Sequence, residues 1–261
     1  IGLPPDHCLT AGDSIYIYQP NTLEYLAANG WTNVVWEDAD QRPFREFIVE
    51  IDHIEGDVAF LNFAIPYAMD AGEARVFSID MIENIALSDF AVTYDLGVAN
   101  PYDVINTAPA YDGLSAIQLM GTNGASISNI DILNAASNGL SITSSTAVVV
   151  DGVTVAGAHN KGGDGNGYGV LLTESFNNSL TDLVLHDGRH SLVFSAWSAE
   201  TGNTIQIADS NRDINFHGSP DVQNSVSIDH LVLDYDPAQD SSGVNSTWAA
   251  ISGGGISHAA T

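Results

Sequence analysis

Positive charge is scarce in this chain. Its 261 residues include six Lys and Arg against 33 Asp and Glu, which gives a formal net charge of −27 at pH 7. Binding to DNA, RNA or an anionic membrane surface needs clustered Lys and Arg that release counterions from phosphates. The composition therefore argues against those partners. Strong acidity with a single lysine, Lys161, suits a secreted protein in saline surroundings, where salt shortens the range of self-repulsion.

Cysteine and long apolar runs are also lacking. Cys8 is the only cysteine, so no internal disulfide can form, and we interpret it as a bystander rather than a nucleophile. No apolar run approaches the ~18 residues that span a bilayer, so we expect no membrane insertion. Hydrophobic residues make up 44% and charged residues 15%, as in a packed globular fold. Because the first residue is Ile1 rather than Met, we expect a processed or excised chain.

The chain divides into two regions that differ in composition and in strand pattern. Residues 1–82 hold β-rich runs such as FIVEIDHIEGDVAFLNFAIP, in which Gly56 and Asp57 form a turn between two strands. From residue 83 onward, short strands are punctuated by Gly, Asn, Ser and Asp. We expect a small N-terminal β module or cap over 1–82 that continues into a second region over 83–261.

A repeat runs through the second region. NGLSITSSTAVVVDGVTV (138–155) aligns with YGVLLTESFNNSLTDLVL (168–185) at an offset of 30, and the extra length falls in the loop 157–167. An offset of 22 then carries Leu172 onto Phe194 and Phe216, and Leu183 and Leu185 onto Ile205 and Ile207. Two short alternating strands per unit are typical of an all-β solenoid, a parallel β-helix that buries one continuous apolar column. A β-sandwich with evenly spaced strands is the alternative.

The repeat turns sequence offset into spatial adjacency. Residues one coil apart lie about 4.7–4.9 Å from each other in a parallel ladder. We therefore expect two stacked columns on the strands, one of them Tyr168, His190 and Arg212, the other Thr173, Ser195 and His217. Alternation along the strands predicts that the residues between the apolar positions face outward, namely Ser191, Val193, Ser195, Asp213, Asn215 and His217.

Rare residue types gather in one part of the repeat. Three of the six cations and four of the eight histidines fall between residues 159 and 217: Lys161, Arg189, Arg212, His159, His186, His190 and His217. A purely structural interpretation pairs Arg212 with Asp213 or Asp187 and lets a corner histidine bond a backbone carbonyl. The concentration itself predicts a site with Lys161, Tyr168, Arg189, His190 and His217 as catalytic candidates. The substrate-binding candidates are His186, Arg212, Asp213 and Asn215.

Three runs carry a family resemblance: AHNKGGDGNGYGVLL (158–172), GRHSLVFS (188–195) and DINFHGSPDVQNSV (213–226). With them the chain resembles the pectin-lyase-like right-handed β-helix superfamily over most of residues 11–236. The resemblance implies a right-handed parallel β-helix preceded by the small N-terminal β module, in an extracellular or cell-surface protein. Superfamily members include polysaccharide lyases, glycoside hydrolases, epimerases and non-catalytic adhesive or tail-spike proteins. Fold alone does not choose among them.

The candidate residues suit more than one activity on polysaccharide. Elimination from an acidic sugar needs a cation, a base and an acid, roles that suit Arg189, then Lys161 or His190, then Tyr168 or His217. Hydrolysis needs two carboxylates about 5–5.5 Å or 6.5–9.5 Å apart, for which Asp187, Asp213 and Glu174 are candidates. The alternative is a non-catalytic surface, adhesive or sugar-binding β-helix, since outward Ser, Thr and Asn ladders need no chemistry.

A cofactor is not required by any motif, and calcium is the one ion that the sequence suggests. The loop GGDGNG (162–167) offers Asp164 and Asn166, whose oxygens are the hard donors that calcium prefers. A flexible loop is the alternative. The four histidines lack the short fixed spacing of a zinc site. Exposed end coils present unpaired strand edges, so we also expect head-to-tail self-association.

Overall fold

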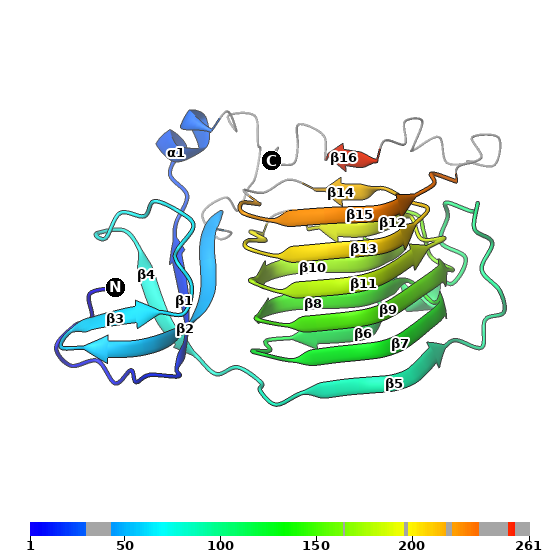
Figure 1. The fold of residues 1–261 in the computed structure, drawn as a ribbon. Helices are drawn as coiled ribbons and strands as arrows, with labels where there is room; N and C mark the ends of the chain where they lie inside the picture. The colour runs from blue at the N-terminus through cyan, green and yellow to red at the C-terminus, as the bar shows by residue number, and fades with distance from the viewer. Residues whose placement is uncertain (30–42, 164, 196–197, 218–220, 235–249, 254–261) are drawn as a thin grey trace.

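Two kinds of β-sheet make up the molecule. A computed structural model describes residues 1–29, 43–163, 165–195, 198–217, 221–234 and 250–253. Figure 1 shows a small antiparallel sheet on one side and a stack of parallel strands on the other. The chain is thus mostly β with parallel sheets, in agreement with the predicted all-β class. No helix in the described ranges is long and apolar enough to cross a membrane.

The N-terminal sheet has four antiparallel strands in the order β3-β2-β1-β4. Its strands are β1 (Ser14–Gln19), β2 (Arg45–Glu55), β3 (Val58–Leu61) and β4 (Arg75–Ile79). The short helix α1 (Leu23–Ala28) follows β1, and the Thr22 hydroxyl caps it by accepting from the Tyr25 N–H. As the sequence predicted, Gly56 and Asp57 form the turn between β2 and β3.

The remaining strands alternate between two six-stranded parallel sheets. We call them the odd sheet and the even sheet after the strand numbers. The odd sheet holds β5 (Ala86–Thr93), β7 (Ser126–Ala135), β9 (Val149–Ala158), β11 (Ser179–His186), β13 (Thr204–Ser210) and β15 (Ser225–Leu231). The even sheet holds β6 (Ser115–Met120), β8 (Asn138–Thr146), β10 (Tyr168–Phe176), β12 (His190–Phe194), β14 (Ile214–Phe216) and β16 (Ile251–Gly253). A 3₁₀ turn, Pro109–Tyr111, precedes β6. The antiparallel sheet thus ends at Ile79 and the first parallel strand begins at Ala86, while the division of the chain into two domains at residue 82 stays a prediction.

The register of the even sheet confirms the predicted offsets. Leu172 pairs with Ile142 one strand back and with Phe194 one strand on, and Phe194 pairs with Phe216. Tyr168 pairs with His190, as the offset of 22 required. Gly139 and Gly169 are each the second residue of their strands, β8 and β10, and a Cβ on Gly139 would lie 2.5 Å from the Gly169 carbonyl oxygen. No side chain fits there, which explains why glycine recurs at this position of the repeat.

The register of the odd sheet corrects the second half of the alignment. Ile205 pairs with Leu180 and Ile207 with Leu183, whereas the offset of 22 had assigned them to Leu183 and Leu185. Two features shift the pairing. An irregularity lies at Leu180/Leu183, where Asp182 has a left-handed φ of 51°. The Asn178 N–H and side-chain amide both donate to Asn203 Oδ1, at 3.0 and 2.9 Å, and so fix where β13 begins.

An internal ladder of asparagines lines one corner of the stack. Asn203 in turn donates to Asn224 through its backbone and its side chain, at 2.9 and 3.0 Å. One level below, Asn178 Oδ1 accepts from the Val148 N–H at 2.9 Å. Asn178 and Asn203 are buried. Each amide therefore satisfies the backbone of a tight corner that the neighbouring strands cannot reach.

The apolar core lies between the odd and even sheets. Leu140, Ile142, Val170, Leu172 and Phe194 from the even sheet meet side chains of the odd sheet such as Val153 and Leu183. The Phe194 and Phe216 rings stack with centroids 4.5 Å apart. A second cluster fills the N-terminal sheet and reaches the stack, where Phe47 packs edge-on against Phe176 at 5.3 Å. The two cores therefore join the N-terminal sheet to the stack.

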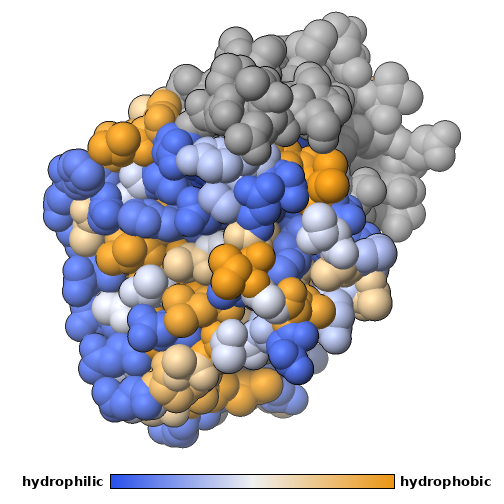
Figure 2. Space-filling view, turned by 90° about the vertical axis from the view of Figure 1, so that its right-hand side faces the viewer, coloured by the Kyte–Doolittle hydropathy of each residue, from blue (hydrophilic) through white to orange (hydrophobic). Residues whose placement is uncertain are grey.

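The segment between β5 and β6 covers one side of the stack. Figure 1 shows it running past the strand ends from the lowest level toward the upper ones. It exposes several apolar side chains, namely Leu96, Val98, Ile105 and Leu114. The surface seen from that side shows apolar and hydrophilic patches interleaved (Figure 2). Basic side chains of the stack hold this segment in place, as described below.

Truncating the stacked phenylalanine tests the register. Phe194 is fully buried, so Phe194→Ala should lower the free energy of unfolding by about 3–5 kcal/mol, the usual cost of removing a core aromatic ring. Half-buried Phe216 should lose less. Urea unfolding measures both, with Val149→Ala, a change at a half-exposed strand position, as the control. Equal midpoints for Phe194→Ala and the control would contradict the register.

The asparagine ladder makes a separate prediction. Asn203→Ala leaves the Asn178 N–H and the Ser175 carbonyl without their buried partners. We expect a loss of about 2–4 kcal/mol of unfolding free energy, since each unsatisfied buried group costs about 1–3 kcal/mol. Exposed Asn62, changed to Ala, is the control. If Asn203→Ala melts like the control, the ladder does not hold the corner.

Candidate functional site

Three of the predicted catalytic side chains meet on the even sheet. Tyr168 begins β10, His190 begins β12, and His217 directly follows β14. The ring centroid of His190 lies 5.7 Å from that of Tyr168 and 6.2 Å from that of His217. Tyr168 and His217 are 6.2 Å apart. We call this set of rings the Tyr-His cluster.

A carboxylate orients the central histidine of the cluster. Asp213 Oδ1 lies 2.7 Å from His190 Nδ1, and both side chains are almost fully buried. The sequence predicted Asp213 on the outer face; it does not face solvent but lies against His190. A carboxylate beside Nδ1 fixes the ring orientation and places the acid–base role on Nε2. This is the arrangement that a positioned general base requires.

Arg189 lies beside the cluster. Its guanidinium donates to the Gly162 carbonyl at 2.6 Å, and its Nε is buried with no hydrogen-bond partner in the described ranges. Burial raises the pKa of Tyr168, and the positive charge of Arg189 opposes that shift. The Tyr168 hydroxyl thus keeps its proton at neutral pH, which suits a proton donor.

Lys161 does not join the cluster through any contact that the structure records. Its Nζ donates to the Asn100 carbonyl at 2.5 Å and to the Asp187 carbonyl at 3.4 Å, and the residue is 1% exposed. Burial, and after it the charge of Arg212, lowers the pKa of Lys161 to about 8. The lysine ties the segment between β5 and β6 to a corner of the stack.

Arg212 has the same kind of environment. Its guanidinium donates to the carbonyls of Gly188 at 3.1 Å, Asn211 at 2.9 Å and Pro101 at 2.9 Å, and to that of Asp234. The structural interpretation paired it with Asp213 or Asp187, and the charges of both acids do act on the guanidinium, while the hydrogen bonds given above go to backbone oxygens. Lys161 and Arg212 therefore fasten neighbouring residues, Asn100 and Pro101, of the covering segment.

The other substrate-binding candidates divide between the two sheets. Asn215 lies on β14, two residues before His217, and is buried. His186 lies on the odd sheet, where its Nε2 is 3.0 Å from Asp209, whose other oxygen is 2.6 Å from His230. Hydrogen bonding from His230 lowers the pKa of Asp209, with the charges of both histidines adding to the effect. His186 thus belongs to a separate surface group.

Of the two calcium candidates, Asn166 lies within the described residues. Asp164 lies outside the described residues. Asn166 is fully buried, and its Oδ1 accepts from the Gly113 N–H at 2.8 Å and the Ser137 hydroxyl at 2.6 Å. Its Nδ2 donates to Asp112 at 2.6 Å. In the part of the chain that the structure covers, no group of three or more His, Cys, Asp or Glu could hold a metal ion.

The carboxylates considered for hydrolysis do not share one site. Asp187 exchanges hydrogen bonds with Asn211, both at 2.8 Å, and Asp213 contacts His190. Glu174 accepts from Ser144 at 2.5 Å and lies instead near Glu46 of the N-terminal sheet. Sequence reasoning missed a group of acids there, which comprises buried Glu46 and Glu200 and half-buried Glu174 and Asp221. No repeat or motif links residue 46 to the stack.

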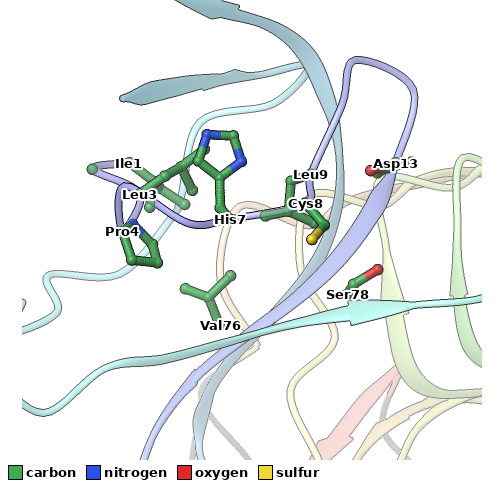
Figure 3. A pocket seen from close by; sticks show the side chains of 10 residues that line it. Ile1, Leu3, Pro4, His7, Cys8, Leu9, Asp13, Val76 and Ser78 are labelled. Atoms are coloured by element: carbon green, nitrogen blue, oxygen red, sulfur yellow. The ribbon is translucent and has the colours of Figure 1, made fainter. Parts of the chain in front are cut away.

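A cavity of about 380 Å³ lies in the N-terminal module. Figure 3 shows its lining, in which Ile1, Leu3, Pro4, Leu9 and Val76 surround a few polar groups. Exposed Cys8 is one of these polar groups. None of the predicted site residues lines this cavity.

Comparison with known proteins gives no family. No model of a protein family matches the chain, and no curated protein matches it. The resemblance to pectin-lyase-like β-helices therefore stays a proposal.

Removing the Lys161 ammonium tests its structural place. Lys161→Met keeps the apolar stem but leaves the Asn100 and Asp187 carbonyls without their donor. We expect a loss of about 1–3 kcal/mol of unfolding free energy, measured by urea unfolding. Arg75→Met is the control, because Arg75 is exposed and bonds only carbonyls beside it in sequence. Equal stability of the two variants would show that Lys161 does not fasten the segment.

Proposed function

We propose that the protein is an extracellular polysaccharide-acting enzyme, a lyase of acidic polysaccharide, with its site at the Tyr-His cluster. The observation that carries this proposal is the meeting of Tyr168, His190 and His217 next to Asp213 and Arg189. The cluster then combines an acid (Tyr168), a base oriented by a carboxylate (His190) and a cation (Arg189). These are the three functions that elimination from a uronic acid needs.

We also propose that the two parallel sheets form a right-handed parallel β-helix of the pectin-lyase-like type. It is supported by strands that alternate strictly between two parallel sheets and pair with the strand two places on. The single apolar core between those sheets and the asparagine ladder at the corner agree with it. The covalent path of such a fold places residues 22–30 apart side by side, as at Tyr168 and His190.

The reaction proposed is a β-elimination. His190, oriented by Asp213, removes the proton from the carbon next to the sugar carboxylate. The electron pair left on that carbon forms a double bond to the neighbouring carbon, whose bond to the glycosidic oxygen breaks. Tyr168 delivers a proton to the departing oxygen, and Arg189 neutralises the carboxylate while negative charge builds on it. His217 stands beside both rings as the alternative proton donor.

Elimination is favoured over hydrolysis by the composition of the cluster. A hydrolase needs two carboxylates that act on the scissile bond, whereas Asp213 contacts His190 and orients it as a base. The local cation also matters for a polyanionic substrate, because the chain as a whole carries a net charge of −27. Arg189 supplies the local positive charge that such a substrate requires.

A second candidate is a non-catalytic surface or adhesive β-helix. Tyr168 and His190 are each 5% exposed, which favours a structural place for their rings. Polar ladders along the stack, such as Gln206 to Asp229 and Asn129 to Asp89, suit sugar binding without chemistry. The two candidates differ in whether a product forms.

The test is product release from a panel of acidic and neutral polysaccharides, with and without calcium. Unsaturated ends are followed by ultraviolet absorbance and reducing ends by a colorimetric assay. We expect unsaturated ends from an acidic substrate, and His190→Ala or Tyr168→Phe should lower turnover about 10²–10⁴-fold with folding intact. His53→Ala, at an exposed histidine of β2, is the control and should keep full activity.

Two outcomes would contradict the lyase. Release of saturated reducing ends alone would indicate a hydrolase. Binding of one polysaccharide without any product would favour the adhesive alternative.

A further inference from the structure

Four acidic side chains gather where the N-terminal sheet meets the parallel stack. Glu46 comes from β2 and Glu174 from β10, while Glu200 and Asp221 lie in connections of the stack. Glu46 and Glu200 are buried, at 2% and 0% exposure. The Tyr-His cluster does not use any of them.

Glu46 makes a buried polar contact between the two parts. Its Oε1 accepts from the Ala199 N–H at 3.0 Å, across 153 residues of sequence, and its Oε2 accepts from the Tyr16 hydroxyl at 2.6 Å. The neighbouring Phe47 packs on Phe176 of the stack. The interface therefore combines an apolar contact with several polar ones, since Tyr67 also bonds Thr201 at 2.6 Å and Asn123 donates to Glu50 at 3.1 Å.

Glu200 and Asp221 face each other with two acceptor oxygens. Glu200 Oε1 accepts from the Ser198 hydroxyl at 2.5 Å and the Glu174 N–H at 2.9 Å, and Asp221 Oδ1 accepts from the Glu200 N–H at 3.2 Å. The remaining oxygens, Glu200 Oε2 and Asp221 Oδ2, are buried without a donor from the described residues. The two carboxyl groups are nevertheless hydrogen-bond neighbours. Two acceptors can bond to each other only when one of them carries a proton.

The groups that face these carboxyls are themselves acids. Tyr16 faces Glu46 from β1, Tyr67 from the segment between β3 and β4 faces Glu46, Glu200 and Asp221, and Glu174 faces Glu46 from β10. Arg45, the residue before Glu46, stacks on the Tyr25 ring at 3.9 Å instead. No cation is among the groups that shift these acids.

Burial without a cation favours the protonated forms. Burial raises the pKa of Glu46 to about 8, with the charge of Glu174 adding to the effect. Burial also raises the pKa of Asp221 to about 7 and that of Glu200 well above its ordinary value. In the folded protein these groups hold protons in mild acid, where they would be ionised in an unfolded chain.

We propose that Glu46, Glu200 and Asp221 form a proton-operated latch between the N-terminal sheet and the parallel stack. The latch is closed while these carboxyls hold their protons. Ionisation places several negative charges in one buried interface, and their repulsion and need for water separate the two parts. The N-terminal sheet would then respond to the pH of its surroundings independently of any activity at the Tyr-His cluster.

The sign of the pH dependence follows from the raised pKa values. The folded state binds more protons than the unfolded state between the ordinary carboxyl pKa and a pH of about 8, so stability falls as pH rises through that window. The stabilisation is complete below the ordinary carboxyl pKa. It is lost by the time the folded groups have ionised.

The experiment compares the parent with the double variant Glu46→Gln/Glu200→Gln. An amide keeps the shape of the carboxyl, and like the protonated carboxyl it has one acceptor oxygen and a donor, but it cannot ionise. Between about pH 5 and about pH 9 the melting temperature of the parent should fall by about 5–10 °C, and that of the double variant by less than half as much. The radius of gyration from small-angle scattering should rise at the higher pH for the parent only. Glu55→Gln, an exposed carboxyl on the same strand β2, is the control and should behave as the parent.

Two results would overturn the latch. One is equal pH dependence of the melting temperature in the parent and the double variant. The other is a closed parent at high pH that needs millimolar calcium and opens with a chelator, because the carboxyl pair would then hold a cation rather than a proton. If the double variant does not fold, Asp221→Asn alone provides the same comparison.

Discussion

In-register stacking of parallel strands is the constraint on which the rest of this structure depends. A ladder spacing of about 4.8 Å brings together residues that are 22 to 30 apart in sequence, so each coil position becomes a column. The columns of Leu, Ile, Val and Phe make the core, and the column of asparagines satisfies a corner. Tyr168 and His190 meet for the same reason. A change in the pairing register of one strand would move its core residues, its asparagine and its cluster residues out of their columns together.

The few positive charges of the stack make contacts at its corners. Lys161 and Arg212 each donate to one backbone carbonyl of the covering segment and to carbonyls of the stack's own connections, and Arg189 donates to the carbonyl of Gly162. A cation can satisfy several carbonyls at a point where no strand supplies N–H groups. These three cations therefore hold loops against the stack, and Arg189 also lies beside the Tyr-His cluster.

The sequence predicted some columns and not others, for identifiable reasons. Leu172, Phe194 and Phe216 recur at a constant offset of 22, so the register of the even sheet could be predicted directly from the sequence. In the odd sheet the irregularity at Asp182 and the amide link from Asn178 to Asn203 shift the pairing, and hydrophobic periodicity carries no information about either. Asp213 was expected at the surface because alternation along a strand shows which sheet face a residue lies on, but not whether other side chains, here His190, cover that face. The acids around Glu46 depend on a contact across 153 residues, which no repeat encodes.

The central claim is that an acidic sugar is processed where Tyr168, His190 and His217 meet. The most direct measurement is a crystal structure of the Tyr168→Phe variant with an acidic oligosaccharide, since loss of the proton donor should leave the substrate intact. The proposed elimination predicts a sugar carboxylate against Arg189, with the carbon next to it facing His190. A sugar bound away from these residues, with the cluster still closed and buried, would contradict it.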